Sequence, residues 1–445
     1  MAGKKSDSFW VRHLLRRAGF GGTPSEIQHY VLLGYDGALD ELLHPQSVDN
    51  DALEADIKQQ NFDFTQIADL KRWWLYRMCY TRRPLEEKMT LFWHGHFATS
   101  EKKVKHAYAM YGQNWIFRKH ALGNFHQLLY DVSKDPAMII WLDNQQNQKG
   151  KPNENYAREI MELFTMGIGN YSEQDIKEAA RAFTGWHTQP DGFHFNEAQH
   201  DFGNKTFLGQ TGNFNGEDVV KILVGQKATS RFLARKLIRF FAFDDPDEEM
   251  IDRIASTYLK SKYNIGKTME VLLSDPLFLS ERSYHAKIKS PAELVVGTVK
   301  TMQLRKLDGD LPSIMARMGQ DLLEPPNVKG WDGGPAWIAT DTMMERFNFA
   351  ARITGAKFED MESYMSPSEL MRKQGLNNAA EMVDYFLQLL VDDDVPTSAR
   401  SRLVAYVSSD IKGDPVKTIP DERTLDAKLR GLVHLIMTLP TYQLA

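Results

Sequence analysis

Apolar residues recur every three or four positions through most of the chain, and this spacing is typical of amphipathic α-helices. Proline and glycine interrupt the pattern at short intervals, for example at Pro84. The pattern predicts helices over residues 65–80, 85–97, 232–243 and 250–265, among others. A chain built from many such segments buries its apolar faces by packing helix against helix. We therefore expect a mainly α protein with a multi-helical globular body.

The periodicity changes between residues 187 and 216, where glycine, asparagine, aspartate and phenylalanine are frequent. Apolar and polar side chains alternate at Phe193, His194 and Phe195, and this is the period of a β-strand. Turn-forming residues on either side favour a hairpin. We therefore predict a small β-hairpin or an ordered loop excursion near residues 190–212.

Residues 152–186 have the pattern of a helix, a turn and a second helix. In the first helix Glu154 and Arg158 are one turn apart and can pair, while Glu159 and Glu162 lie close to one line. Two carboxylates in different environments can hold different pKa values, so that one acts as an acid and the other as a base. Glu154, Glu159 and Glu162 are therefore candidate catalytic residues. The alternative is a solvated acidic face with ion pairs inside the helix.

Two histidines, His94 and His96, end a helical pattern that is rich in aromatic residues. Residues two apart do not share a helix face, so the pair can cooperate only at a helix end or in a loop. A His-x-His pair can bind a divalent metal, and zinc, manganese or iron suits a set of histidine and carboxylate ligands. The alternative is that both rings are packed under aromatic side chains with their nitrogens satisfied.

A third polar group, formed by His200, Asp201 and Lys205, falls in the region of the predicted hairpin. An aspartate beside a histidine can fix its tautomer or take part in proton transfer. His200 and Asp201 are therefore candidate catalytic residues, and Lys205 is a candidate substrate contact. The alternative is ordinary turn chemistry at the rim of a hairpin.

Proline and glycine fix the shape of the loop at residues 318–337, which also carries asparagine, lysine and tryptophan. Such side chains are typical of surfaces that bind sugars or other polar ligands, and the candidate substrate contacts here are Asn327, Lys329 and Trp331. Trp186, at the end of the helix–turn–helix segment, is a fourth candidate. The alternative is a structural loop that clamps two helices through buried tryptophan.

Two groups of cations are able to bind a carboxylate or a phosphate. Arg235, Lys236 and Arg239 form the first group, and Lys287 and Lys289 form the second. The alternative is that these residues pair with the acidic helices.

Composition limits the classes of protein that need to be considered. The 445 residues are 42% apolar and 25% charged, as in an ordinary globular protein, and a net charge of −5 gives no reason to expect a nucleic-acid partner. The single cysteine, Cys79, excludes an internal disulfide and a cysteine-rich metal site. No apolar stretch is long enough to span a membrane, and no apolar segment of a signal peptide follows the first lysines. A cytoplasmic location is therefore favoured.

Six ordered motifs and the ending LPTYQLA resemble the bacterial family called domain of unknown function 1800. The motifs are HLLRRAGFG (13–21), WHGHF (93–97), the helix–turn–helix segment (152–186), HDFGNKTFLGQTG (200–212), KSPAELVVG (289–297) and GQDLLEPPNVKGWDGGPAWI (319–338). The resemblance covers nearly the whole chain and implies a single family unit, residues 1–445. Within it we distinguish a helical N-terminal part (1–150), a motif-bearing centre (151–350) and a helical C-terminal part (351–445).

Many members of that family carry export signals, and many are encoded beside a companion family, domain of unknown function 1501. The companion family resembles the alkaline phosphatase and sulfatase superfamily. The resemblance therefore implies envelope or extracellular substrates such as sulfated or phosphorylated glycans, and it makes a protein of the companion family a candidate partner. This chain departs from the exported pattern because it has no visible signal.

These observations favour an enzyme, a hydrolase or lyase that acts on a polar, carbohydrate-like substrate through glutamate, histidine and aspartate. Motifs of P-loop proteins, serine hydrolases, zinc proteases and dinucleotide-binding enzymes are absent. The alternative is a non-catalytic helical scaffold that binds a glycan or the companion protein. An enzyme requires His94, Glu159 and His200 around one cleft, whereas a scaffold leaves them dispersed.

Overall fold

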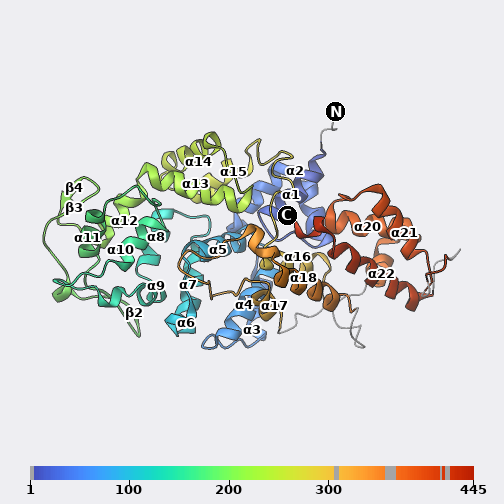
Figure 1. Ribbon diagram of the computed structural model, residues 1–445, viewed down its shortest axis with the longest axis horizontal. Coiled ribbons are helices and arrows are strands. Elements are labelled where there is room, and N and C mark those ends of the chain that lie inside the picture. Colours follow the sequence, from blue (N-terminus) through green and yellow to red (C-terminus); the bar gives the residue numbers. More distant parts are fainter. Residues whose placement is uncertain (1–4, 305–309, 356–366, 411–412, 416–420) are drawn as a thin grey trace. The chain divides into compact units, whose positions relative to one another are not determined.

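The computed structural model describes residues 5–304, 310–355, 367–410, 413–415 and 421–445. Within these ranges the chain forms 22 α-helices and two small two-stranded sheets (Figure 1). The prediction of a mainly α fold with a small β excursion is therefore confirmed. Each described helix is too short or too polar to cross a lipid bilayer, as the lack of long apolar stretches predicted.

Contacts divide the chain into two compact units. Unit 1 consists of Met1–Ala38, Tyr284–Asp321 and Gly333–Ala445, and unit 2 consists of Leu39–Ser283 and Leu322–Asp332. Each unit is therefore assembled from segments that are separate in the sequence. The middle of the Pro/Gly-rich loop belongs to unit 2.

Unit 2 begins as a succession of helices joined by short turns. These are α3 (Asp51–Gln59), α4 (Ile67–Tyr80), α5 (Pro84–His96), α6 (Glu101–Val104), α7 (Ala107–Lys119), α8 (Phe125–Ser133) and α9 (Pro136–Trp141), with 3₁₀ turns η1 (Pro45–Ser47) and η2 (Asn144–Gln146). The elements that follow are α10 (Asn155–Glu162), α11 (Glu173–Ala182), β1 (Trp186–Gln189), β2 (Gly192–Phe195), η3 (Glu197–Gln199), β3 (Lys205–Phe207), β4 (Gln210–Gly212), α12 (Gly216–Val224), α13 (Lys227–Phe241), α14 (Glu248–Lys260) and α15 (Ile265–Leu273).

Helix α5 is part of the core of unit 2, and most of its residues are buried. Among them is the carboxylate of Glu87, which is fully buried. It accepts hydrogen bonds from Trp74 Nε1 at 3.1 Å, from Arg77 Nε at 3.4 Å and from Arg118 Nε at 2.6 Å. A buried charge needs such donors to offset its loss of hydration. This Glu87 cluster ties α4, α5 and α7 together.

The helix predicted over residues 250–265 is interrupted. Helix α14 ends at Lys260, and the next helix begins only at Ile265. Lys262 and Tyr263 have φ values of 53° and 69°, which a helix cannot contain. Asn264 then caps the new helix by accepting a hydrogen bond from Lys267 N at 2.8 Å. The break is thus local, although the apolar periodicity continues through it.

The β excursion consists of two hairpins in succession. Strand β1 pairs antiparallel with β2, with Trp186 opposite Phe195. Strand β3 pairs antiparallel with β4, with Lys205 opposite Gly212. Both hairpins lie in unit 2, and β3 contacts α11.

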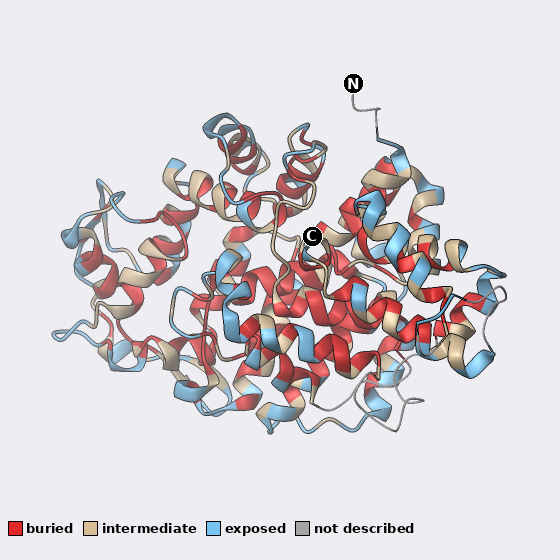
Figure 2. Ribbon diagram, turned by 45° about the vertical axis from the view of Figure 1, so that its right-hand side comes forward, coloured by how far each residue is buried: buried red, intermediate tan, exposed pale blue. Residues whose placement is uncertain are grey.

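The regular elements in the described residues of unit 1 are all helices, joined by loops and two isolated β-bridges. It contains α1 (Asp7–Arg17), most of α2 (Pro24–Leu43), α16 (Pro291–Thr301), α17 (Leu311–Arg317), η4 (Gly334–Ile338), α18 (Thr340–Ile353), α19 (Pro367–Gln374), α20 (Ala379–Val391), α21 (Thr397–Val407), α22 (Glu422–Met437) and η5 (Pro440–Gln443). Helix α2 bends at Gly34, which has non-helical backbone angles. In both units buried residues follow one side of most helices and exposed residues the other (Figure 2).

Candidate functional site

Helices α10 and α11 form the predicted helix–turn–helix segment in unit 2. Helix α10 buries Tyr156 and Ile160 against the core, and it leaves Glu159 and Glu162 half-buried on its polar side. The amphipathic pattern therefore fixes which side of the helix carries the carboxylates.

The turn after α10 requires glycine at position 167. Gly167 has a φ of +75°, and a Cβ added there would lie 2.9 Å from Cδ2 of Phe232 on α13. Helix α11 then begins at a capping box in which Ser172 and Asp175 exchange side-chain and backbone hydrogen bonds. The turn thus holds the end of α10 against α13.

A cleft of about 580 Å³ opens in unit 2 at this turn. Its lining includes Glu162 from α10, three arginines from α13 and Lys329 from the Pro/Gly-rich loop. The other lining residues are mainly apolar: Leu163, Met166, Gly167, Ile168, Asn170, Ala228 and Phe232. The cleft, called the α10–α13 cleft below, therefore combines four cations and one carboxylate with an apolar floor.

The two carboxylates at this cleft have different surroundings. Glu162 Oε2 accepts a hydrogen bond from the Tyr171 hydroxyl at 2.8 Å. Burial raises the pKa of Glu159, and the negative charge of Glu162 raises it further, while Arg158 and Lys329 oppose the rise. Glu159 does not line the cleft, but it interacts electrostatically with Glu162 and Lys329, which do.

Three arginines of α13 are spaced four residues apart and share one face of the helix. Arg231 pairs with Glu248 and Asp252, and Arg235 pairs with Glu248 at 2.8 Å. Arg239 is exposed, and its Nε donates to the backbone oxygen of Asp244 at 3.1 Å. Within the described ranges Arg239 therefore has no carboxylate partner.

Lys236, one turn from Phe232 on the same helix, adds a cation behind the cleft. Its Nζ lies 3.5 Å from the backbone oxygen of Leu163 and 5.2 Å from the centre of the Phe232 ring. Burial lowers the pKa of Lys236 to about 8, because an ammonium group loses hydration there.

Glu154 takes part in a half-exposed ion-pair group instead of the cleft. It lies 3.4 Å from Arg158, as the spacing predicted, and Arg158 is also paired with Glu173 at 2.9 Å. Such pairs contribute little stability and leave the carboxylate hydrated. A catalytic role for Glu154 has no geometric support.

His94 is buried where the Pro/Gly-rich loop packs on the end of α5. Its Nε2 accepts a hydrogen bond from Leu323 N at 3.1 Å, and the centre of the Trp331 ring lies 5.4 Å from its own. A Cβ on Gly330 would lie 2.5 Å from the backbone oxygen of Gly95, so this close approach of the loop to the helix requires glycine at position 330. Burial lowers the pKa of His94 to about 3, which keeps the ring neutral.

His96 is buried as well, and its Nε2 lies 3.0 Å from the backbone oxygen of Phe164. Burial lowers the pKa of this ring well below its ordinary value. Both histidines thus use Nε2 for backbone groups of different segments. The part of the chain that the structure describes contains no group of three histidine, cysteine, aspartate or glutamate side chains able to hold a metal. The geometry therefore does not fit the expected divalent metal at His94 and His96.

The group of His200, Asp201 and Lys205 supports the hairpins. Asp201 is paired with Arg181 at 2.8 Å, and this hydrogen bond lowers the pKa of Asp201 to about 2. Lys205 Nζ donates to the backbone oxygens of Asp201 and Gly203, and His200 Nδ1 lies 2.8 Å from that of Thr184. All three side chains therefore already have partners, and none of them lines the α10–α13 cleft.

The remaining candidate substrate contacts lie in different surroundings. Trp186 is only 3% exposed and packs edge-on against Phe183. Asn327 Oδ1 accepts a hydrogen bond from Lys329 N at 2.8 Å and so shapes the loop that carries the lysine. Lys329 itself lines the cleft, whereas Trp331 faces His94.

The structure thus brings Glu162, Lys329 and, beside them, Glu159 together. His94 and His200 do not line this cleft, so the structure does not show the convergence of His94, Glu159 and His200 that was expected of an enzyme. A catalytic role for the cleft rests on the carboxylates and cations alone.

The sequence patterns missed Arg231, which lines this cleft, and Tyr171, which donates a hydrogen bond to Glu162. The helical spacing of Arg235 and Arg239 would have indicated Arg231 one turn earlier.

A family model described as "Protein of unknown function (DUF1800)" matches residues 13–444. No curated protein and no solved structure matches the chain significantly.

Proposed function

The chain belongs to the DUF1800 family of proteins of unknown function, and from the residues at the α10–α13 cleft we propose that it is an acid–base enzyme. It is a hydrolase or lyase that acts on an anionic, carbohydrate-like substrate bound in the α10–α13 cleft. The observation that carries this proposal is that Glu162 and Lys329, from motifs far apart in the sequence, line the same cleft.

The carboxylates supply the acid–base chemistry in this proposal. Glu159, with its raised pKa, is suited to hold a proton, and Glu162 is suited to accept one from a substrate or a water molecule in the cleft. The Tyr171 hydroxyl, 2.8 Å from Glu162, orients that carboxylate. General acid–base catalysis by such groups accelerates reactions by about 10²–10⁴-fold.

The charge of the lining supports the choice of an anionic substrate. Three arginines and a lysine line the cleft together with one carboxylate. Because Arg231 and Arg235 are paired with acidic residues of α14, Arg239 and Lys329 supply the positive charge of the cleft. Arginine binds sulfate, phosphate and carboxylate groups through paired hydrogen bonds, and the exposed guanidinium of Arg239 is available for this role. The ring of Phe232 provides an apolar surface on which a sugar ring can pack.

A second candidate function is a non-catalytic scaffold that binds a glycan or a protein of the companion family. It is favoured by the structural roles of the histidines, since His94 and His200 both bond to backbone atoms of other segments. A scaffold needs the cations of the cleft but not its carboxylates. The two functions therefore differ in what they require of Glu162.

The test incubates the protein with sulfated, phosphorylated and uronic-acid oligosaccharides and with their neutral counterparts. We expect turnover of an anionic oligosaccharide by the wild type and a loss of about 100-fold or more in Glu162→Gln. The matched control is Glu197→Gln, because Glu197 is an exposed glutamate of the same unit. Binding without turnover, unchanged in Glu162→Gln, would establish the scaffold. If no anionic oligosaccharide is bound or turned over, the result contradicts both the proposed enzyme and a glycan-binding scaffold.

A further inference from the structure

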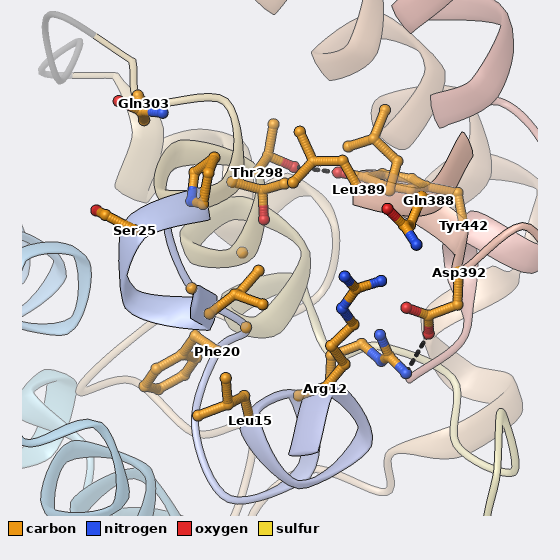
Figure 3. A pocket seen from close by; sticks show the side chains of 18 of the residues that line it. Arg12, Leu15, Phe20, Ser25, Thr298, Gln303, Gln388, Leu389, Asp392 and Tyr442 are labelled. Atoms are coloured by element: carbon orange, nitrogen blue, oxygen red, sulfur yellow. Dashed lines mark hydrogen bonds and ion pairs between the residues drawn. The ribbon is translucent and has the colours of Figure 1, made fainter. Parts of the chain in front are cut away.

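A second cavity, of about 440 Å³, lies within unit 1 (Figure 3). Residues of α1, α16, α19 and α20 line it, together with the turn that contains Tyr442. Its size is that of pockets that hold small organic molecules. None of the residues proposed for catalysis belongs to it, so the inference below is independent of the proposed function.

The wall of this unit 1 pocket is divided between apolar and polar side chains. Leu15 and Phe20 lie on one side of the pocket, and Gln388 and Tyr442 lie on the opposite side (Figure 3). The hydroxyl groups of Thr298 and Tyr442 are 2.7 Å apart and satisfy each other. A bound molecule would therefore meet an apolar surface and a polar surface at once.

Most charged groups of the pocket have partners. Arg16 is paired with Asp392, and Lys373 is paired with Glu369 at 3.2 Å. Lys289 Nζ donates to the backbone oxygen of Tyr442 at 2.7 Å, and burial, aided by the charge of Arg16, lowers the pKa of Lys289 to about 7. These groups therefore do not attract an external charge strongly.

Arg12 differs from them. Its Nε is buried, and within the described ranges it has no hydrogen-bond partner. The side chain points into the open space of the pocket, toward Gln388 (Figure 3). Arg12 attracts the carboxylate of Asp393 electrostatically, but no ion pair joins the two among the residues described. In the described part of the chain, the Nε of Arg12 is therefore a buried donor that lacks a partner unless a bound molecule supplies one.

A second unsatisfied donor faces the same pocket from α20. The hydroxyl oxygen of Tyr385 is buried, and no described residue forms a hydrogen bond with it. Tyr385 and Arg12 come from helices that are distant in the sequence, yet both line this pocket. Two buried donors in the lining of one pocket, without partners in the described ranges, favour a ligand that accepts hydrogen bonds, such as an anion.

We propose that the unit 1 pocket binds a small organic anion, a carboxylate or a phosphate ester on an apolar body. The guanidinium of Arg12 binds the anionic group, and Tyr385 and Gln388 donate further hydrogen bonds. Leu15 and Phe20 contact the apolar body.

The experiment measures binding to the full chain by isothermal titration with benzoate, phenyl phosphate and neutral benzamide. We expect at least one of the two anions to bind and benzamide to bind about tenfold more weakly or not at all. The preference between benzoate and phenyl phosphate identifies which anionic group the pocket takes. Equal binding of benzamide and both anions, or no binding of either anion at millimolar concentrations, overturns the proposal.

Two variants locate the site. Arg12→Gln should weaken the binding of the preferred anion about tenfold or more, whereas Arg402→Gln, at an exposed arginine of the same unit, should leave it unchanged. Tyr385→Phe removes only a hydroxyl group, so it tests the pocket even if Arg12→Gln fails to fold. The proposal is overturned if Tyr385→Phe binds the anion with wild-type affinity and Arg12→Gln either does the same or fails to fold. The anion then binds elsewhere.

Discussion

Unit 2 places glutamates beside arginines in two regions, and the pKa of the carboxyl group shifts in opposite directions in the two. In the Glu87 cluster, burial alone would raise the pKa of the carboxyl, but the charges and hydrogen bonds of Arg118 and Arg77 outweigh this and lower it. At the α10–α13 cleft, burial raises the pKa of Glu159, and the neighbouring Glu162 adds to the rise. The first carboxylate is therefore fixed as an ion, whereas the second can change its protonation state.

The difference arises from the donors, not from the residue type. Glu87 accepts hydrogen bonds from Trp74, Arg77 and Arg118, whereas at Glu159 the charges of Arg158 and Lys329 only partly oppose the effects of burial and of Glu162. A carboxylate with many charged donors contributes to the fold, and one with few is available for proton transfer. The predictions below test this contrast.

Glu87→Gln should produce the largest change, a loss of about 3–5 kcal/mol in the free energy of unfolding, because it leaves the buried Arg118 without a counter-charge and removes one of the two carboxylate partners of Arg77. Urea unfolding followed by circular dichroism measures the loss. The matched control is Glu54→Gln, which removes a half-exposed partner of the same Arg77 and should cost about 1 kcal/mol or less. Similar losses in the two variants would show that burial of Glu87 does not decide its contribution.

Gly330→Ala should cost about 3 kcal/mol, because the new Cβ would lie 2.5 Å from the backbone oxygen of Gly95 in a left-handed backbone conformation. Gly169→Ala separates the two causes. Gly169 has a φ of +87° but no atom within 4 Å of an added Cβ, so only the backbone term of about 1 kcal/mol applies. Thermal unfolding of both variants measures the difference, and equal losses would contradict close packing of the loop on α5.

His94 should make the protein less stable in acid. Its folded pKa of about 3 lies below the ordinary value of 6.5, so the unfolded chain binds the proton more tightly. The contribution of neutral His94 to the free energy of unfolding is therefore fully present above pH 6.5 and is lost as the pH falls toward 3. Between pH 7 and pH 5 this loss amounts to about 2 kcal/mol. Urea unfolding at both pH values should show a smaller loss in His94→Gln than in the wild type or in His44→Gln, whose ring is exposed. An equal loss in all three would contradict a buried neutral His94.

The smallest of these four changes should be a fall in the pKa of Glu159 in Glu162→Gln, because the substitution removes a neighbouring negative charge. Titration of ¹³C-labelled glutamate carboxyl groups by NMR measures this pKa. Glu197→Gln, at an exposed position, should leave it unchanged. A pKa of Glu159 that does not respond to Glu162→Gln would mean that the two carboxylates act independently.

Most helices and the presence of a small β excursion could be predicted because their signals are local, although a single hairpin was expected and the structure has two. The apolar period of α10, the Ser172 cap and the alternation around Phe193 each depend on a few neighbouring residues. The break between α14 and α15 was missed, because left-handed angles at Lys262 and Tyr263 leave no mark on the apolar pattern.

The candidate site could be predicted only in part, because its geometry joins distant segments. Residue type and motif indicated Glu159, Glu162 and Lys329 separately, but no local pattern shows that they meet. The sequence does not reveal the burial of Glu87 either, because its position is that of an ordinary acid in the first turn of a helix. The histidines suggested a metal because ligand spacing in the sequence does not reveal that a ring nitrogen already binds Leu323 N.

The division of unit 2 between two stretches of sequence has a consequence for synthesis. Residues 322–332 supply Lys329 to the cleft and Leu323 to His94, yet a ribosome makes them after the segment Tyr284–Asp321 of unit 1. While the chain emerges, unit 2 therefore exposes the end of α5 until this late segment arrives. Long-range closure of this kind slows folding and prolongs exposure of apolar surface. A chain truncated after Ser283 would resemble that nascent state, and we expect it to bind chaperones and aggregate.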